Sequence, residues 1–262
     1  MCRWLAYSGD PIFLEEALYA PENSLASQSL HAIKSKTVVN GDGFGVGWYT
    51  DRKTPGVYRE ILPAWNDRNL ENLSAHISSG LFMAHVRAAT HGEISRTNCH
   101  PFSYENWLFV HNGQIGGYSH IKWFLDRLIP ENLYASRQGS TDSELIFFLL
   151  LANGFETDPQ AAIEKSFMQV LDCMEQYNVT QAFRFTGAIS DGKRLYAIRY
   201  SSDDQPPTLF WKQSDQHVLI ASEPLEETDQ DQYSADSWQA VKAKGFLSIL
   251  PGSVQQSFLN LP

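Results

Sequence analysis

The sequence contains 262 residues, of which 43% are hydrophobic and 19% are charged, and its formal net charge is -10. This is the composition of a globular protein, with enough apolar residues for one large core or two small ones. An acidic surface repels phosphate backbones, so nucleic acid is not an expected partner. The longest apolar run, residues 145–152, is far shorter than the roughly 20 residues of a membrane-spanning helix, so no membrane span is predicted.

The N-terminus and the cysteines indicate the compartment. The first residues, Met-Cys-Arg-Trp-Leu-Ala-Tyr-Ser-Gly, contain no basic region followed by an apolar run, so they are not a secretory signal peptide. The cysteines are Cys2, Cys99 and Cys173, and so odd and sparse a set does not form a disulfide framework. The sequence therefore predicts a cytoplasmic protein with reduced thiols.

Hydrophobic periodicity and turn residues predict strands towards both ends of the chain and helices in the middle. The pair Asp191-Gly192 lies between two segments rich in strand-forming residues and indicates a β-hairpin. Short links between strands favour antiparallel sheets with helices packed outside them, so the pattern predicts a layered α+β domain. In chain order, the expected elements are a helix over 11–19, a strand over 43–49, a helix over 67–78, strands over 80–87 and 107–111, helices over 117–128, 142–151 and 159–177, and strands over 183–190, 193–200, 208–211 and 217–221.

Two patterns resemble ligand sites but favour other interpretations. Glycines alternate with larger residues from position 41 to 47, yet no helix follows, so this is not a dinucleotide-binding loop. A strand with one bare face, packed close to another backbone, is expected instead. The residues His85, His91, Cys99, His100 and His111 do not have the spacing of a zinc finger or zinc ribbon, so no metal site is expected.

Cys2 is the first candidate for chemistry. Removal of Met1 is expected because the side chain that follows it is small. The new terminus would carry a thiol and an α-amine on one residue, and such an amine has a pKa of about 7.7–8.0, far below that of lysine. It can therefore act as the base that activates the thiol. The alternative is that Cys2 is an incidental small apolar residue.

Three other short patterns carry polar groups suited to a charged substrate. Arg87 ends a predicted strand, where a guanidinium can hold a carboxylate with two parallel hydrogen bonds, although a surface arginine beside a turn fits as well. Asn112 and Gly113 offer a side-chain amide and an uncovered backbone N–H, which suit an oxyanion, or else they form a common Asn-Gly turn. Thr141 or Asp142 caps the next predicted helix, and a carboxylate there would also suit a substrate ammonium group.

These motifs occur together in a fixed order. The segments Met-Cys-Arg, Arg-Ala-Ala-Thr-His-Gly, Asn-Cys-His-Pro-Phe, His-Asn-Gly-Gln-Ile and Ser-Thr-Asp-Ser-Glu resemble the glutaminase domain of the class II glutamine amidotransferases, which belong to the N-terminal nucleophile hydrolases. The resemblance runs from residue 2 to about residue 151, and residues 221–225 look like the same domain in stand-alone members. It implies one domain over residues 1–262 and a four-layer sandwich, in which two antiparallel sheets lie between helix layers.

The resemblance also implies a reaction and the residues that perform it. Cys2 supplies the thiolate and the base, and the Asn112 side chain and the Gly113 N–H form the oxyanion hole. The thiolate attacks a γ-glutamyl amide and leaves a γ-glutamyl thioester, which water cleaves without a metal or organic cofactor. Nothing after about residue 225 is long enough for a synthetase domain, so no ammonia acceptor is expected in this chain.

The same resemblance implies how the substrate is held. Arg87 binds the α-carboxylate of glutamine and Asp142 its α-ammonium group, Thr90 and His91 shape the pocket, and His100 lies in a matching motif but is assigned no chemical step. The expected substrate is glutamine or a γ-glutamyl small molecule or peptide. One alternative is a glutaminase subunit that supplies ammonia to a separate acceptor or synthetase subunit. The other is a non-catalytic binding protein on the same fold, which the intact motifs argue against.

Overall fold

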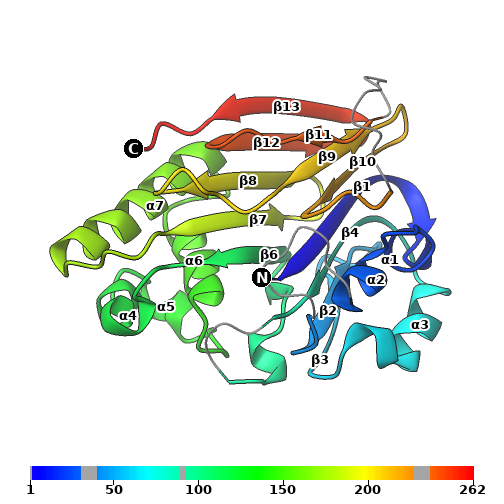
Figure 1. The fold of residues 1–262 in the computed structure, drawn as a ribbon, viewed down its shortest axis with the longest axis horizontal. Coiled ribbons are helices and arrows are strands. Elements are labelled where there is room, and N and C mark those ends of the chain that lie inside the picture. Colours follow the sequence, from blue (N-terminus) through cyan, green and yellow to red (C-terminus); the bar gives the residue numbers. More distant parts are fainter. Residues whose placement is uncertain (1, 31–39, 89–92, 227–236) are drawn as a thin grey trace.

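The computed structural model describes residues 2–30, 40–88, 93–226 and 237–262, and these form two sheets that pack face to face (Figure 1). One sheet contains seven strands: β1 (Arg3–Phe13), β2 (Phe44–Trp48), β3 (Gly56–Glu60), β4 (Ser78–Val86), β9 (Phe210–Gln213), β10 (His217–Ala221) and β11 (Gln239–Ala240). The other contains six: β5 (Phe102–Tyr104), β6 (Trp107–Gln114), β7 (Arg184–Ser190), β8 (Leu195–Ser201), β12 (Gly245–Leu250) and β13 (Ser253–Phe258). Their spatial orders are β11-β9-β10-β1-β4-β2-β3 and β13-β12-β8-β7-β6-β5, and the paired strands are antiparallel.

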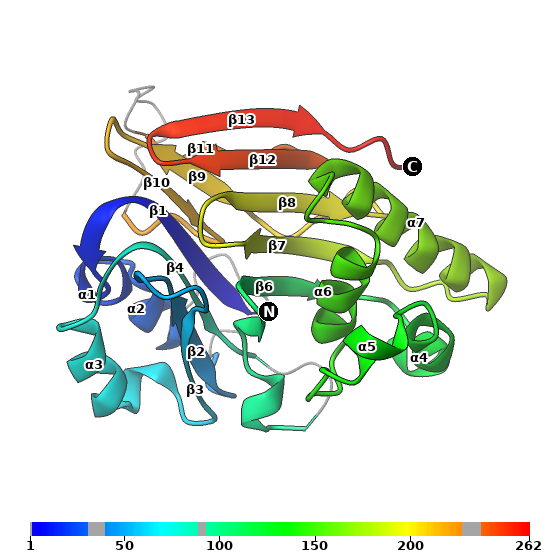
Figure 2. The ribbon, with the colours of Figure 1, turned by 180° about the vertical axis from the view of Figure 1, so that it is seen from behind.

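Helices cover the outer face of each sheet, which confirms the predicted four-layer sandwich (Figure 2). They are α1 (Glu15–Leu18), α2 (Leu25–Leu30), α3 (Arg68–Ser74), α4 (Tyr118–Asp126), α5 (Glu131–Tyr134), α6 (Asp142–Ala152) and α7 (Pro159–Gln176), with short 3-10 turns at Ala64–Asn66 and Arg96–Asn98. Leu18 and Leu70 belong to the core outside the seven-stranded sheet, and Phe147 and Phe167 to the core outside the other. A third core, which includes Trp4, fills the space between the sheets.

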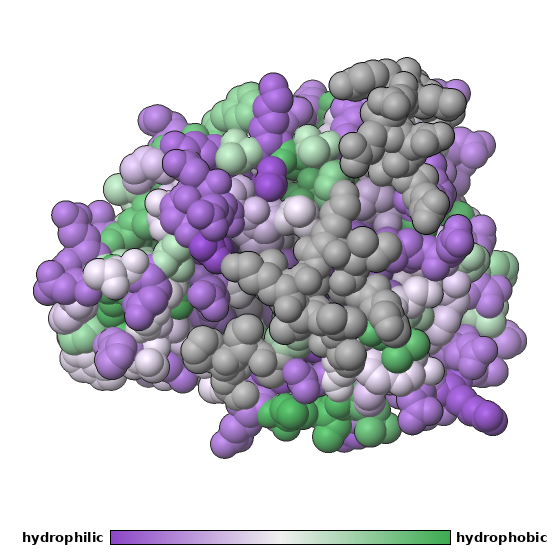
Figure 3. Space-filling view, viewed as in Figure 1, coloured by the Kyte–Doolittle hydropathy of each residue, from purple (hydrophilic) through white to green (hydrophobic). Residues whose placement is uncertain are grey.

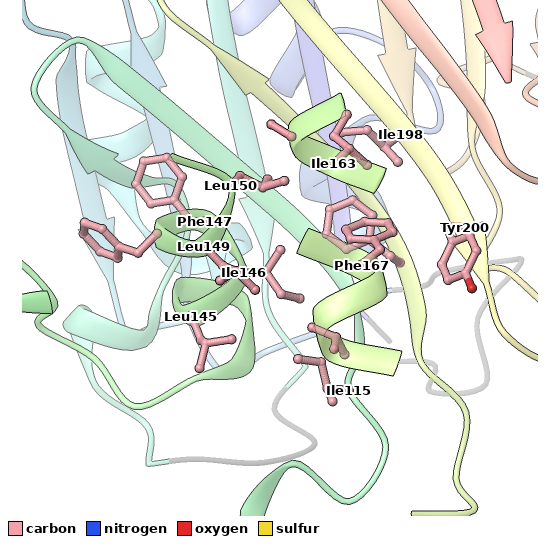
Figure 4. Packing of buried hydrophobic residues seen from close by; sticks show 14 of the residues in the cluster. Ile115, Leu145, Ile146, Phe147, Leu149, Leu150, Ile163, Phe167, Ile198 and Tyr200 are labelled. Atoms are coloured by element: carbon pink, nitrogen blue, oxygen red, sulfur yellow. The ribbon is translucent and has the colours of Figure 1, made fainter. Parts of the chain in front are cut away.

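Helix α6 is buried on every side, as its nearly continuous apolar sequence requires. Its residues from Ser143 to Leu150 are all buried. Figure 4 shows its apolar side chains beside Ile163 and Phe167 of α7. The Thr141 hydroxyl accepts a hydrogen bond from the Glu144 N–H at 3.2 Å, so the predicted N-cap is confirmed. The cap at Thr141 and the buried residues from Ser143 onward fix the start of the helix, where Asp142 lies.

The largest error of the sequence-based prediction concerns β1. The sequence predicts a helix over residues 11–19, but β1 continues to Phe13 and α1 begins only at Glu15. The pattern also predicts no strand before residue 11, although β1 lies between β4 and β10 in its sheet. Residues Arg3 to Ser8 are all buried, so the alternation of polar and apolar residues that reveals a half-exposed strand is absent there.

Two local predictions are confirmed, the bare glycine strand and the hairpin. A Cβ atom on Gly45 of β2 would lie 2.2 Å from the carbonyl oxygen of His100, so only glycine allows the two backbones to approach this closely. At the hairpin, β7 and β8 pair with Ser190 opposite Leu195, on either side of the predicted Asp-Gly turn. The first of these contacts holds the His100 segment against the seven-stranded sheet.

The face of the molecule shown in Figure 3 is largely hydrophilic where the structure describes it. None of the helices in the described ranges combines the length and the apolar composition that crossing a bilayer requires.

Candidate active site

Cys2 lies immediately before β1, next to the end of β4. Its sulfur is 3.4 Å from both the N and the O atoms of Ala88. The pairing of β1 with β4, in which Arg3 lies opposite Val86, places the two segments side by side. Burial raises the pKa of the Cys2 thiol, while the hydrogen bond to Ala88 and the charges of Arg87 and Arg3 act in the opposite direction. Because the raising effect is the larger one, the thiol needs a base to ionise near neutral pH.

Arg87 continues the pairing between β4 and β2 beyond the end of the strand. Its N–H donates to the Gly43 carbonyl at 2.8 Å, and its carbonyl accepts from the Asp42 N–H at 3.0 Å. The side chain is only 4% exposed, and Nη1 lies 3.4 Å from the carbonyl oxygen of Glu93. The alternative of a surface arginine is therefore wrong, and a buried guanidinium is fixed one residue away from the partner of the Cys2 thiol.

Asn112 and Gly113 lie within β6, so the alternative of an Asn-Gly turn is also wrong. They pair with Thr186 and Phe185 of β7, and a Cβ atom on Gly113, whose φ is 155°, would lie 2.0 Å from the carbonyl oxygen of Arg184. The Asn112 side chain is 2% exposed, and its amide nitrogen has no hydrogen-bond partner among the described residues. Buried donors are nearly always paired, so this amide is suited to a partner that arrives with a ligand.

Asp142 is held at the start of α6, close to the end of β6. Its Oδ2 accepts from the Ile115 N–H at 2.8 Å, and its Oδ1 accepts from the Ser143 N–H at 2.9 Å. A surface cavity of about 530 Å³ opens beside Asp142, Thr141 and Gln114. The two backbone bonds fix the orientation of the carboxylate at the edge of a space large enough to admit part of a small molecule.

Three buried histidines lie behind these residues and connect the two sheets. The rings of His85 on β4 and His100 stack with their centroids 4.1 Å apart. His85 Nε2 donates to the carbonyl oxygen of His111 on β6 at 3.1 Å, because a carbonyl can only accept. Burial lowers the pKa of His85 and His111 to about 3, and that of His100 also falls well below its usual value. The cluster is therefore neutral near pH 7 and bridges the strand beside Cys2 to the strand that carries Asn112.

We expect these histidines to make the folded state strongly sensitive to acid. Between pH 6.5 and about 3 the histidines take up protons in the unfolded chain but stay neutral in the folded one, so the free energy of unfolding falls as the pH is lowered. Each such histidine contributes a slope of about 1.4 kcal/mol per pH unit. Urea unfolding at several pH values between 5 and 6.5 measures this slope.

The variant His85→Gln tests this expectation, because glutamine keeps a donor for the His111 carbonyl but does not titrate. Its slope should be smaller than that of the wild type by the contribution of one histidine. The same change at the exposed His120 provides the control and should leave the slope nearly unchanged. An unchanged slope in the His85→Gln protein would show that His85 is not kept neutral by the fold.

Two predicted pocket residues, Thr90 and His91, lie outside the described residues. His100 is described, is 4% exposed, and neither of its ring nitrogens has a hydrogen-bond partner among the described residues. No group of three or more His, Cys, Asp or Glu side chains that could hold a metal ion is found in the described ranges. The role that the structure supports for His100 is therefore the stacking of its ring against the ring of His85.

Sequence analysis missed a connection that runs through Ser143. Its hydroxyl oxygen is 2.8 Å from Nδ1 of His111, and its N–H binds the Asp142 carboxylate. Ser143 therefore connects Asp142, the residue expected to bind the substrate ammonium group, to His111, the residue that precedes Asn112. His111 and Ser143 are 32 positions apart, and a contact between distant segments leaves no local pattern in the sequence.

Comparison with known sequences identifies the family. A family model described as class II glutamine amidotransferases matches residues 19–205. The Saccharomyces cerevisiae protein named probable glutamine amidotransferase DUG3 is 31% identical, over 95% of this chain and 82% of that protein. The Mycolicibacterium smegmatis gamma-glutamyl-hercynylcysteine sulfoxide hydrolase is 27% identical, over 87% of this chain and 89% of that protein.

Solved structures agree with the sequence comparison. A glutamine aminotransferase class-II domain protein from Silicibacter pomeroyi superposes with a TM-score of 0.76 at 34% identity, over 98% of this chain and 99% of that one. The glutamine phosphoribosylpyrophosphate amidotransferase of B. subtilis shares the fold, with a TM-score of 0.64 at 16% identity, over 99% of this chain and 50% of that one. From the match to the family model and these relatives, the chain belongs to the class II glutamine amidotransferases.

Proposed function

We propose that this enzyme hydrolyses γ-glutamyl amides with Cys2 as its nucleophile, after removal of Met1. The observation that carries the proposal is the bridge from His85 to the His111 carbonyl. His85 lies opposite Trp4 in the pairing of β1 with β4, and His111 precedes Asn112. The bridge therefore joins β4, the strand that pairs with β1 beside Cys2, to β6, which carries the Asn112 amide that has no partner among the described residues. This supports a nucleophile near an oxyanion donor, the arrangement that acyl transfer requires.

The proposed reaction proceeds through a thioester. The α-amine of Cys2 takes the thiol proton, and the thiolate attacks the carbon of the γ-amide. The Asn112 amide and the Gly113 N–H stabilise the oxyanion of the tetrahedral intermediate. The amine leaves with the proton from the Cys2 ammonium group, and water then cleaves the γ-glutamyl thioester, which releases a γ-carboxylate and restores the free thiol. Arg87 and Asp142 bind the α-carboxylate and the α-ammonium group throughout.

The substrate is glutamine or a γ-glutamyl small molecule or peptide. The name of the mycobacterial relative, which aligns along most of both chains, describes a hydrolase of a γ-glutamyl conjugate, and this supports a γ-glutamyl small molecule as the substrate. The free thiols of Cys2, Cys99 and Cys173 are consistent with work in the cytoplasm. The second candidate is an ammonia-supplying subunit of a larger assembly, and it predicts that purified protein acts only when a synthetase partner is added.

Intact mass spectrometry after exposure to an electrophilic glutamine analogue tests the nucleophile and the processing together. We expect one adduct on a chain without Met1, because a peptide bond to Met1 would remove the basicity of the Cys2 amine. Cys2→Ala should give no adduct, whereas Cys173→Ala, which changes a buried cysteine on α7, should react like the wild type. Full activity in a homogeneous sample that retains Met1 would rule out the proposed mechanism.

A further inference from the structure

We infer that the buried pair Arg3–Glu223 is a positioning device for the Cys2 nucleophile. The inference rests on the proposed function, since it assigns a role in the same reaction. Arg3 Nε donates to Oε1 of Glu223 at 2.5 Å, and both side chains are 1% exposed. The Nη1 of the same guanidinium donates to the carbonyl oxygen of Cys2 at 2.9 Å. The planar guanidinium of Arg3 therefore links the backbone of Cys2 to the carboxylate of Glu223, which lies 220 positions after Arg3 in the sequence.

The position of Cys2 explains why such a link is needed. Once Met1 is removed, Cys2 has a peptide bond on one side only, and regular strand structure begins at Arg3. Rotation about the bond between the Cys2 α-carbon and its carbonyl carbon would turn the thiol and the α-amine together. The hydrogen bond from Arg3 holds the peptide plane between Cys2 and Arg3, and with it the direction of this bond. The contact of the Cys2 sulfur with the Ala88 N–H at 3.4 Å limits rotation about the bond, so both reacting groups keep one orientation towards the substrate.

Glu223 is itself held in place by the segment that follows β10. The adjacent Ser222 N–H donates to the Trp4 carbonyl at 3.0 Å, and the Ser222 hydroxyl accepts from the Trp4 N–H at 3.1 Å. The Ser222 carbonyl accepts from the Thr208 hydroxyl at 2.8 Å. These bonds tie the backbone next to Glu223 to Trp4, the residue of β1 that follows Arg3. The Glu223 carboxylate is therefore held beside Arg3 and fixes the position of the Arg3 guanidinium.

Two observations separate this role from substrate binding and from simple stabilisation. The buried Arg3 guanidinium is bound to Glu223 and to the Cys2 carbonyl, so we assign its effect on the reaction to Cys2 and not to a substrate contact. Buried ion pairs contribute little to stability compared with apolar side chains of similar volume, because both charges lose their hydration.

The double variant Arg3→Met/Glu223→Met tests the inference in the full-length, Met1-processed protein. A single substitution would leave one buried charge unpaired and strongly destabilise the fold, whereas the double variant removes both charges and keeps the volume. We expect its thermal midpoint to stay near that of the wild type, its kcat to fall roughly 10- to 100-fold, and its KM for a γ-glutamyl amide to change little. The control Lys212→Met/Glu226→Met removes an ion pair nearer the surface and should keep the wild-type kcat.

Arg3→Lys provides a second test that keeps the buried charges balanced. Lysine has one nitrogen in place of the guanidinium fork, so it cannot reach Glu223 and the Cys2 carbonyl from separate atoms, and kcat should again fall with little change in KM. Wild-type kcat in the folded double variant or in Arg3→Lys would overturn the inference while leaving the proposed function intact. Wild-type protein that neither turns over γ-glutamyl amides nor labels at Cys2 would overturn the proposed function, and the inference with it.

Discussion

Replacement of Asn112 by alanine is expected to lower kcat by roughly 10²–10³-fold, the usual effect of losing one oxyanion-hole donor. The KM should change much less, because the bond to the substrate oxygen becomes strong only as negative charge develops in the transition state. Steady-state kinetics with a γ-glutamyl amide measure both constants. An Asn112→Ala enzyme with wild-type turnover would remove this residue from the oxyanion hole.

The structure also predicts that this variant folds normally. The Asn112 amide nitrogen is buried without a hydrogen-bond partner among the described residues, so its removal breaks no bond that those residues make. Truncating a buried group that has no partner costs much less stability than breaking a buried pair. The thermal midpoint should therefore stay close to that of the wild type. Asn106→Ala, which removes a bond to the Asp191 carbonyl at the opposite end of β6, is the matched control and should retain its turnover.

Replacement of Arg87 by alanine is expected to lower kcat/KM for γ-glutamyl substrates by a factor equivalent to about 2–5 kcal/mol, the range for a buried, hydrogen-bonded charge pair. Wild-type enzyme should discriminate against an analogue without the α-carboxylate by a similar amount, and Arg87→Ala should lose most of that discrimination. A double-mutant-style cycle, with Arg87→Ala as the change in the enzyme and loss of the α-carboxylate as the change in the substrate, measures the coupling between the two groups. Arg194→Ala, at an exposed arginine of the β7–β8 hairpin, should behave like the wild type.

The same cycle applies to Asp142 and an analogue without the α-amine. Asp142→Asn is the better substitution there, because its remaining carbonyl oxygen can still accept from the Ile115 N–H. Strong coupling between Asp142 and the α-amine would support the pocket assignment. Additive losses for Arg87→Ala and the decarboxylated analogue would show that Arg87 does not contact that carboxylate.

Local patterns predicted much of the fold and the site because the residues involved act over short distances. The cap at Thr141, the helix over residues 159–177 and the turn at Gly192 each depend on neighbours within a few positions, and each is found close to its predicted place. The motif that contains Asn112 was recognised from its sequence, although the structure places it in a strand and not in a turn.

The features that were missed depend on distant parts of the chain. Strand β1 has no alternating pattern because Arg3 to Ser8 are buried against neighbours on all sides. Strands β12 and β13 were not predicted, and β13 shows why, since it lies at the edge of its sheet and most of its residues are polar and exposed. The contact between the Cys2 sulfur and Ala88 spans 86 positions and uses backbone atoms, which every residue has. Such contacts are fixed by the assembled sheets and not by any short segment.

The place of β1 between β4 and β10 has a consequence for when the chain can fold during its synthesis on the ribosome. The ribosome makes the strand that begins beside Cys2 first, but one of its two partners, β10, is among the later parts to emerge, with Leu5 pairing with Ala221. Pairing over so long a separation forms slowly and cannot precede synthesis of the partner. The nascent chain therefore carries its thiol through most of translation without a complete sheet around it. The sheet that places Cys2 beside Ala88 is therefore complete only when nearly the whole polypeptide has been made.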